Sequence, residues 1–378
     1  MVISNGILFC DDNTFRQMDI ETLGNTITSI GEESVSFGAD ILDAKGGYVV
    51  PGLVDIHIHG AMGEDFCDGT PKAMQTMANF LLNQGVTSFL ATSMALPEER
   101  LTDIYKTAQP LVNQSILGQA TLQGINMEGP FFNVKKRGAQ NEKYIMDADF
   151  DLFMRLRKAS GNNIRTVAIA PEVKGGLDFI QKASSMCSVS LAHSCADYDT
   201  ASQAFAYGAN HATHLFNGMV SDHYNPGIVG AAADYDAYVE LICDGMHIHP
   251  SMVRAVFKLF TDDRVCLISD AMRACGMPDG QYDLGGQMVT VANGSATIDS
   301  GSLAGSVTVL TDCLRRAVQF GVPLKSALKA TTINPAKSVG LDDKIGSLSK
   351  GKCADILILD RDLVRKHVIL GGVLCALS

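Results

Sequence analysis

The sequence predicts an α/β fold in which a (β/α)8 TIM-type barrel carries a small β-sandwich domain formed from both chain termini. From Pro51 onward, short apolar runs alternate with segments of helical period, which is typical of βα units. Eight such runs of strand length can be counted, the number that closes a parallel barrel. Both ends of the chain instead contain short strands separated by Gly, Asn and Asp residues, which favours β structure there.

The elements follow one another along the chain. The first strands are expected at 3–8, 14–20, 26–30 and 47–50. Barrel strands are expected at 53–58, 87–92, 122–127, 166–170, 189–192, 212–216, 239–243 and 265–268. Helices are expected at 72–83, 98–113, 147–158, 197–207 and 250–260, then a hairpin over 287–291 and 295–298, and helices near 307–320 and 324–331. Strand-like segments return at 354–359, 366–370 and 373–377. Residues 51–344 are therefore expected to form the barrel, and residues 1–50 with 345–378 one discontinuous domain.

Composition narrows the class of protein. The chain has 378 residues, 46% of them hydrophobic, and a formal net charge of −11, so a large core is expected. This acidity argues against nucleic acid or an anionic membrane surface as a partner. No apolar run of about 18 residues and no basic leader resembling a signal peptide is present. Ten cysteines without a CxxC pair fit reduced thiols, and a cytoplasmic location is expected.

Ligand-type side chains gather where the predicted barrel strands end. His57 and His59 are two residues apart on the first strand, so their rings share one side and can hold one ion. The later strand ends add Glu128, His193, His214 and Asp270. Barrel enzymes assemble their active sites at this face, and imidazoles with carboxylates are ligands of Zn²⁺ or Fe²⁺. These six residues predict a divalent metal site, whereas His211, His249 and His367 are expected to be structural or surface groups.

Several motifs carry a family resemblance. They are PGLVDIHIHG at 51–60, MEGPF at 127–131, AHS at 192–194, THLFNGM at 213–219, CDGMH at 243–247, SDA at 269–271 and GSLAGS at 301–306. On these motifs the chain resembles the N-acetylglucosamine-6-phosphate deacetylases of the amidohydrolase superfamily over nearly its whole length.

The resemblance implies a role for each predicted ligand. Glu128, His193 and His214 match the positions that bind the principal metal of the family. His57 and His59 match a pair that completes a second site in some members, so one or two ions per subunit are expected and two are favoured. Asp270 matches the catalytic aspartate, which would take a proton from the attacking water and deliver it to the departing amine.

The resemblance also implies substrate contacts, with two departures from the family pattern. The matching positions are Ala139, Gln140, Asn217, Gly218, His223, Tyr224, Asp244, His247, Leu303, Ala304 and Gly305. Gln140 stands where relatives carry histidine, and it can donate a hydrogen bond but carries no charge. Tyr224 or Asn225 stands where relatives carry an arginine that grips the sugar phosphate from a neighbouring subunit, and neither can bind phosphate bidentately. His223, or the basic trio Lys135, Lys136 and Arg137, could contribute instead, although that trio is expected to be a solvated loop.

The resemblance implies hydrolysis of the acetamide of N-acetylglucosamine 6-phosphate, in amino-sugar catabolism. It also implies a homodimer whose site is shared across the interface. One alternative is a different N-acetylhexosamine, either an epimer or a sugar without phosphate. Another is a different amidohydrolase, such as a cyclic amidase or an N-acyl-D-amino acid deacylase. A third is a non-catalytic sugar-phosphate sensor, which the six intact ligand positions argue against.

Overall fold

Eight parallel strands form the barrel in the computed structural model, which describes residues 1–31 and 40–376. They are β6 (Leu53–Ile58), β9 (Val86–Ser93), β10 (Thr121–Glu128), β11 (Ile164–Ile169), β12 (Ser188–Leu191), β13 (His211–Ala212), β14 (Tyr238–Ile242) and β15 (Val265–Ile268). Neighbouring strands of this sheet follow one another in chain order from β6 to β15. Where β15 meets β6, the Asp270 amide donates to the His57 carbonyl at 2.9 Å. The predicted barrel is confirmed.

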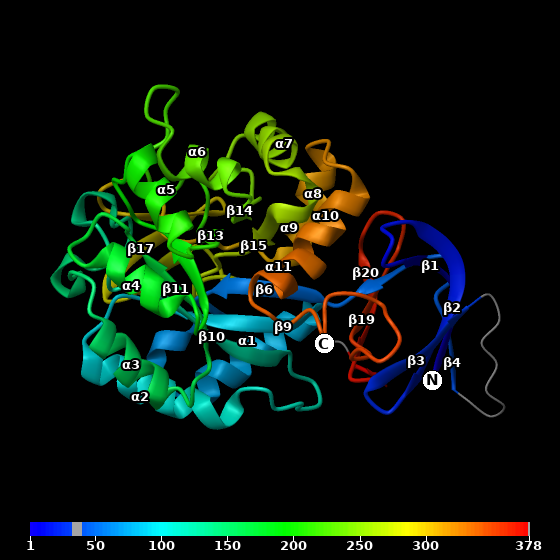
Figure 1. Ribbon diagram of the computed structural model, residues 1–378. Helices are drawn as coiled ribbons and strands as arrows, with labels where there is room; N and C mark the ends of the chain where they lie inside the picture. The colour runs from blue at the N-terminus through cyan, green and yellow to red at the C-terminus, as the bar shows by residue number, and fades with distance from the viewer. Residues whose placement is uncertain (32–39, 377–378) are drawn as a thin grey trace.

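Helices surround the barrel (Figure 1). They are α1 (Pro71–Asn83), α2 (Glu98–Ala108), α3 (Phe150–Ala159), α4 (Gly176–Ala183), α5 (Tyr198–Ala206), α6 (Gly227–Asp234), α7 (Pro250–Leu259), α8 (Thr261–Arg264), α9 (Leu310–Gln319), α10 (Leu324–Thr331) and α11 (Ile333–Ser338). Short 3-10 turns are η1 (Phe66–Asp68), η2 (Gln109–Leu111), η3 (Val134–Lys136) and η4 (Glu142–Tyr144). The helices α4, α6, α8 and α11 were not among those expected from the sequence.

Two differences between the expected and the observed helices have a clear physical reason. The segment GIVGAAAD of α6 is apolar around most of its circumference and largely buried, so it lacks the one-sided pattern that marks a surface helix. The helix expected at 98–113 ends at Ala108, and the chain continues as the turn η2. Pro110 has no amide hydrogen to continue the helical ladder, which explains the early end.

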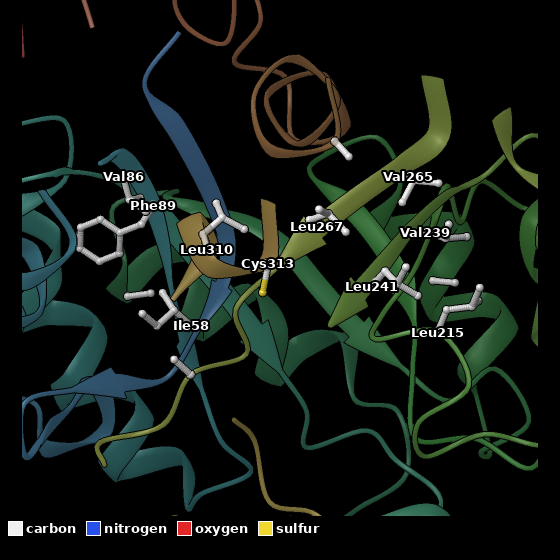
Figure 2. Close-up of a cluster of buried hydrophobic side chains, with 14 of the residues drawn as sticks. Ile58, Val86, Phe89, Leu215, Val239, Leu241, Val265, Leu267, Leu310 and Cys313 are labelled. Carbon is white, nitrogen blue, oxygen red and sulfur yellow. The ribbon is translucent and has the colours of Figure 1, made fainter. Parts of the chain in front are cut away.

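The main core lies between the strands and their helices. Figure 2 shows part of it, with Val239, Leu241, Val265 and Leu267 on β14 and β15 and with Leu310 and Cys313 on α9. A second apolar cluster fills the barrel interior with side chains from β6, β9, β14 and β15 and with residues from α11 and the segment after it. The polar residues of the candidate site lie outside this apolar cluster, at the carboxyl ends of the strands.

Strands from both chain ends form one eight-stranded sheet beside the barrel (Figure 1). Its members are β1 (Val2–Phe9), β2 (Phe15–Leu23), β3 (Thr26–Gly31), β4 (Ile41–Asp43), β5 (Tyr48–Pro51), β19 (Ile356–Leu359), β20 (Arg365–Leu370) and β21 (Val373–Leu374). Antiparallel pairing of β5 with β19 joins the two ends, whereas β1 pairs in parallel with β4 and β5. β21 is shorter than expected, and position 377 lies outside the described residues. The domain boundaries at 50/51 and 344/345 stay a prediction.

A small sheet covers one side of the barrel mouth. It consists of β16 (Gly280–Leu284), β17 (Gln287–Ala292) and β18 (Ser295–Ile298), and a two-stranded hairpin, β7 (Gly60–Ala61) with β8 (Glu64–Asp65), follows β6. The expected hairpin is present as β17 and β18, to which β16 adds a third strand. Leu284 packs with Met94 and Ala139 in a separate apolar cluster, which places this sheet against the site. Within residues 1–31 and 40–376, no helix is both long enough and apolar enough to cross a membrane.

Candidate metal centre

Unusual backbone conformations occur where three of the barrel strands end. His193, His214 and Asp270 have φ angles of 46°, 29° and 48°. Such conformations cost a residue with a side chain about 1–3 kcal/mol and occur where the surrounding structure imposes them, often at functional sites. β13 ends at Ala212 because His214 and Phe216 both leave the strand conformation. The strand expected at 212–216 was therefore wrong beyond its first residue.

The Glu128 carboxylate, at the end of β10, lies between two pairs of histidines. Its Oε1 is 3.2 Å from Nε2 of both His193 and His214. Its Oε2 is 3.4 Å from His59 Nε2, and His57 Nε2 lies 3.6 Å from Oε1. Two groups of candidate ligands result, His57–His59–Glu128 and Glu128–His193–His214, and they share Glu128. The structure thus brings together the residues that the sequence predicted.

Asp270 completes this cluster, and the donor set fits a divalent ion. Asp270 Oδ1 lies 3.5 Å from His57 Nε2 and 3.3 Å from His59 Nε2. Nε2 of His57 is buried without a hydrogen-bond partner among the described residues. Burial lowers the pKa of His57, but the charges of Glu240 and Asp270 outweigh it and raise that pKa to about 10. The cluster therefore favours positive charge, as a site for Zn²⁺ or Fe²⁺ requires.

Hydrogen bonds to the other ring nitrogen orient two of the histidines. His193 Nδ1 lies 2.9 Å from the carbonyl oxygen of Lys136, and His57 Nδ1 lies 2.9 Å from Glu240 Oε2. Because both partners only accept, Nδ1 carries the proton in the neutral ring, and the Nε2 lone pair is then available to a metal. Gly218 has φ 62°, and a Cβ there would lie 2.9 Å from His193 Nδ1, so a side chain at this position would displace the ring.

A cavity of about 380 Å³ lies above the candidate metal ligands. The predicted site residues that line it are His59, Glu128, Ala139, Gln140, His193, His214, Asn217, Gly218, His247, Asp270, Leu303 and Gly305. His57 is fully buried beneath it. Lys135 and Lys136 also line the cavity, and Lys136 Nζ donates to the Met219 carbonyl at 3.1 Å. The expectation of a merely solvated loop was wrong for Lys136, which is half-buried and hydrogen-bonded, whereas Lys135 is exposed.

Four predicted substrate residues do not line the cavity. Asp244 lies behind His247 and accepts its Nδ1–H at 2.7 Å, which leaves Nε2 of that histidine for a substrate. Ala304 is buried between Leu303 and Gly305. His223 and Tyr224 are exposed, Tyr224 to 89%, on the loop that precedes α6 and projects from the barrel (Figure 1). From this chain alone, these four side chains are not placed to touch a molecule in the cavity.

The sequence reasoning missed two acidic residues that support the site. Glu240 is completely buried on β14 and contacts His57. A single acid inside the apolar strand YVELI was the signal that could have revealed it. Glu172 accepts hydrogen bonds from Ser194 Oγ at 2.7 Å and from the Cys195 amide, and so fixes the loop that follows His193. No signal in the sequence singled out Glu172.

Gln140 differs from its expected role as a substrate contact. Its Nε2 donates to Glu128 Oε2 at 2.7 Å, and its Oε1 accepts the Ala95 amide at 2.7 Å. The side chain is only 2% exposed. Although it lines the cavity, both ends of the amide are thus bound within the protein, and Gln140 supports a metal ligand.

Gln140→Leu is expected to lower the free energy of unfolding of the metal-free protein by about 1–3 kcal/mol, because it leaves the buried Ala95 amide and one Glu128 oxygen unpaired. Gln123→Leu, which removes one half-buried bond to Ser88, is the matched control and should cost less. Urea unfolding followed by circular dichroism measures both. Equal losses in the two variants would contradict this reading of Gln140.

Comparisons with known proteins agree with this geometry. The amidohydrolase family profile matches residues 48–375. The chain is 34% identical over 363 residues to N-acetylglucosamine-6-phosphate deacetylase of Lysinibacillus sphaericus, covering 94% of this chain and 92% of that protein. It is 33% identical over 332 residues to N-acetylgalactosamine-6-phosphate deacetylase of Escherichia coli O157:H7, covering 86% and 87%. A mutant Mycobacterium smegmatis N-acetyl-D-glucosamine-6-phosphate deacetylase, solved in complex with N-acetyl-D-glucosamine-6-phosphate, superposes with a TM-score of 0.93 at 29% identity over 99% of this chain and 98% of that one.

Proposed function

Because the chain belongs to the amidohydrolase family, we propose that it hydrolyses the acetamide of N-acetylglucosamine 6-phosphate to glucosamine 6-phosphate and acetate. The observation that carries the proposal is Glu128, shared by two histidine pairs beside Asp270 at the base of an open cavity. The named deacetylases that the chain resembles along most of its length support the substrate class. An intact set of six candidate ligands argues against a non-catalytic sensor.

Amide hydrolysis at neutral pH needs a strong nucleophile and stabilisation of the developing oxyanion. A divalent ion, Zn²⁺ or Fe²⁺ in this proposal, would supply both by lowering the pKa of water to about 7 and polarising the carbonyl. Burial raises the pKa of Asp270, but the charge of His57 and the hydrogen bond to His59 hold it below its ordinary value. The Asp270 carboxylate is therefore ionised at neutral pH and can accept a proton from the attacking water. It then returns that proton to the leaving amine as the C–N bond breaks.

Recognition of the sugar is assigned to the wall of the cavity. His247, oriented by Asp244, and the backbone around Asn217 and Gly218 are proposed to hold the pyranose. Gly305 has φ 63°, and a Cβ there would lie 3.0 Å from the Asp270 carbonyl, so glycine lets this loop lie close to the catalytic residue.

Phosphate recognition is proposed to involve two subunits. The exposed loop with His223 and Tyr224 does not reach the cavity of its own chain, so in a homodimer it would act on the neighbouring site. Neither residue offers the bidentate geometry of arginine. Lys135 and Lys136, which line the cavity, would supply positive charge in its place.

An acetate-release assay over a panel of sugars tests the substrate. The panel compares four sugars at equal concentration. They are N-acetylglucosamine 6-phosphate, its epimers N-acetylgalactosamine 6-phosphate and N-acetylmannosamine 6-phosphate, and free N-acetylglucosamine. We expect a higher kcat/KM with N-acetylglucosamine 6-phosphate than with the free sugar, because the cavity wall carries cations that can pair with phosphate. We expect it to exceed the values for the epimers because the Lysinibacillus sphaericus relative is named for this sugar. A higher value for the galactosamine epimer would assign the activity named for the Escherichia coli relative. Equal rates with and without phosphate would contradict the phosphate role of the lysines.

A further inference from the structure

Glu240 is a buried carboxylate on β14, a strand that supplies none of the six candidate ligands. It nevertheless contacts ligand residues of both metal positions. Its Oε2 lies 2.9 Å from His57 Nδ1 and accepts the backbone amide of His214 at 3.2 Å. Removing a carboxylate from water costs several kcal/mol unless partners compensate. The partners that compensate here are two residues of the metal centre.

The two carboxylate oxygens of Glu240 differ in their hydrogen bonding. Oε2 receives both hydrogen bonds from the ligand residues, whereas Oε1 has no hydrogen-bond partner among the described residues. The imidazole of His211 lies beside Oε1, with its Nε2 3.5 Å away. A buried acid that served the packing of the barrel alone would be expected to satisfy both oxygens. Glu240 instead accepts its hydrogen bonds from two of the candidate metal ligands, His57 and His214.

Hydrogen bonding to Glu240 determines which nitrogen of His57 can bind a metal. A carboxylate only accepts, so the proton of the neutral imidazole sits on Nδ1 and the lone pair on Nε2. That Nε2 is the atom that faces Glu128 Oε1 and Asp270 Oδ1 at 3.6 and 3.5 Å. Carboxylate partners of this kind fix the ring orientation of a metal-binding histidine and increase its basicity.

We propose that Glu240 is the positioning residue of the His57–His59–Glu128 metal position. It orients His57 for that ion and couples the ring to the backbone of His214 on the other position. The inference rests on the proposed metal centre and goes beyond it, because it assigns metal affinity to a residue that contacts neither metal nor substrate.

Metal titration of the full-length protein tests the role. Metal-free parent, Glu240→Gln and Glu240→Ala are titrated with Zn²⁺ against a chromophoric chelator, and Co²⁺ spectra report the coordination. Loss of such a partner lowers metal affinity about 10–100-fold. Glu240→Ala should show this loss for one ion per chain, and Glu240→Gln a smaller one, because the amide oxygen can still accept from His57. Asp355→Asn, which alters a carboxylate of the terminal sheet that accepts the Gly371 amide, is the control.

Each outcome decides between the alternatives. Affinities of both variants within threefold of the parent would overturn the positioning role, as would equal losses in Glu240→Ala and Asp355→Asn. If Glu240→Ala does not fold, Glu240→Gln alone decides, and an unchanged Co²⁺ spectrum with unchanged affinity overturns the proposal. A parent that binds neither Zn²⁺ nor Co²⁺ would instead remove the metal centre itself, so the two failures are distinguishable.

Discussion

Asp270→Asn is expected to lower kcat by about 10²–10⁴-fold, the usual contribution of a positioned general acid–base group. Asparagine has nearly the same shape and can still approach His59, but it cannot accept a proton from water or deliver one to the amine. Substrate binding should persist, because the cavity wall formed by Asn217, His247 and Leu303 is unchanged. Acetate release measures turnover, and calorimetric titration with N-acetylglucosamine 6-phosphate measures binding.

The control for this variant is a second buried aspartate that does not line the cavity. Asp55 accepts the backbone amides of His57 and Ser269, and burial raises its pKa to about 6 despite these bonds. Asp55→Asn keeps an acceptor oxygen and should retain most of the activity. Metal content is measured for both variants, because Asp270 also lies within reach of the metal. An Asp270→Asn enzyme with full metal content and more than a tenth of the parental kcat would remove Asp270 from the catalytic role.

Much of the barrel could be predicted because burial leaves a clear record in the sequence. Strands covered on both faces appear as continuous apolar runs, and surface helices as one-sided patterns. The hydrophobic pattern was misleading where an element was neither a fully buried strand nor a helix with one polar face. α6 is apolar on most sides, and β13 stops early because His214 and Phe216 adopt positive φ angles that no apolar pattern records. Pairing of β5 with β19 joins chain ends more than 300 residues apart, and only their β-rich composition hinted at it.

The site was predictable to the extent that its residues lie at or directly after the carboxyl ends of barrel strands. His57, His59 and Glu128 could be placed on one face from strand position alone, because the carboxyl ends of parallel strands meet there. Glu240 could not, because it projects from the middle of a strand and its importance depends on its contact with His57, two strands away around the barrel. Gln140 and Lys136 lie on a loop, and the course of a loop depends on tertiary contacts that sequence spacing does not encode.

Removal of metal is expected to abolish activity completely, and added Zn²⁺ or Fe²⁺ to restore it. Four imidazoles and two carboxylates converge there, and the proposed reaction depends on the ion that they would hold to lower the pKa of the attacking water. The thermal midpoint should fall at the same time, because a ligand present at a thousand times its Kd stabilises the folded state by about 4 kcal/mol. Exhaustive dialysis against a chelator, elemental analysis and calorimetry follow activity, stoichiometry and stability together.

Elemental analysis also distinguishes one bound ion from two, and the raised pKa of His57 predicts how metal affinity depends on pH. His59→Gln should reduce the bound metal by one ion per chain if both positions are filled, and leave the ion held by Glu128, His193 and His214. Because the raised pKa of His57, about 10, keeps its ring protonated at neutral pH when no metal is bound, metal binding must release a proton there. Affinity should therefore fall as the pH is lowered, and an unbuffered titration should acidify. Full activity after exhaustive chelation, with no metal detected, would show that the histidine and carboxylate cluster acts by some other chemistry.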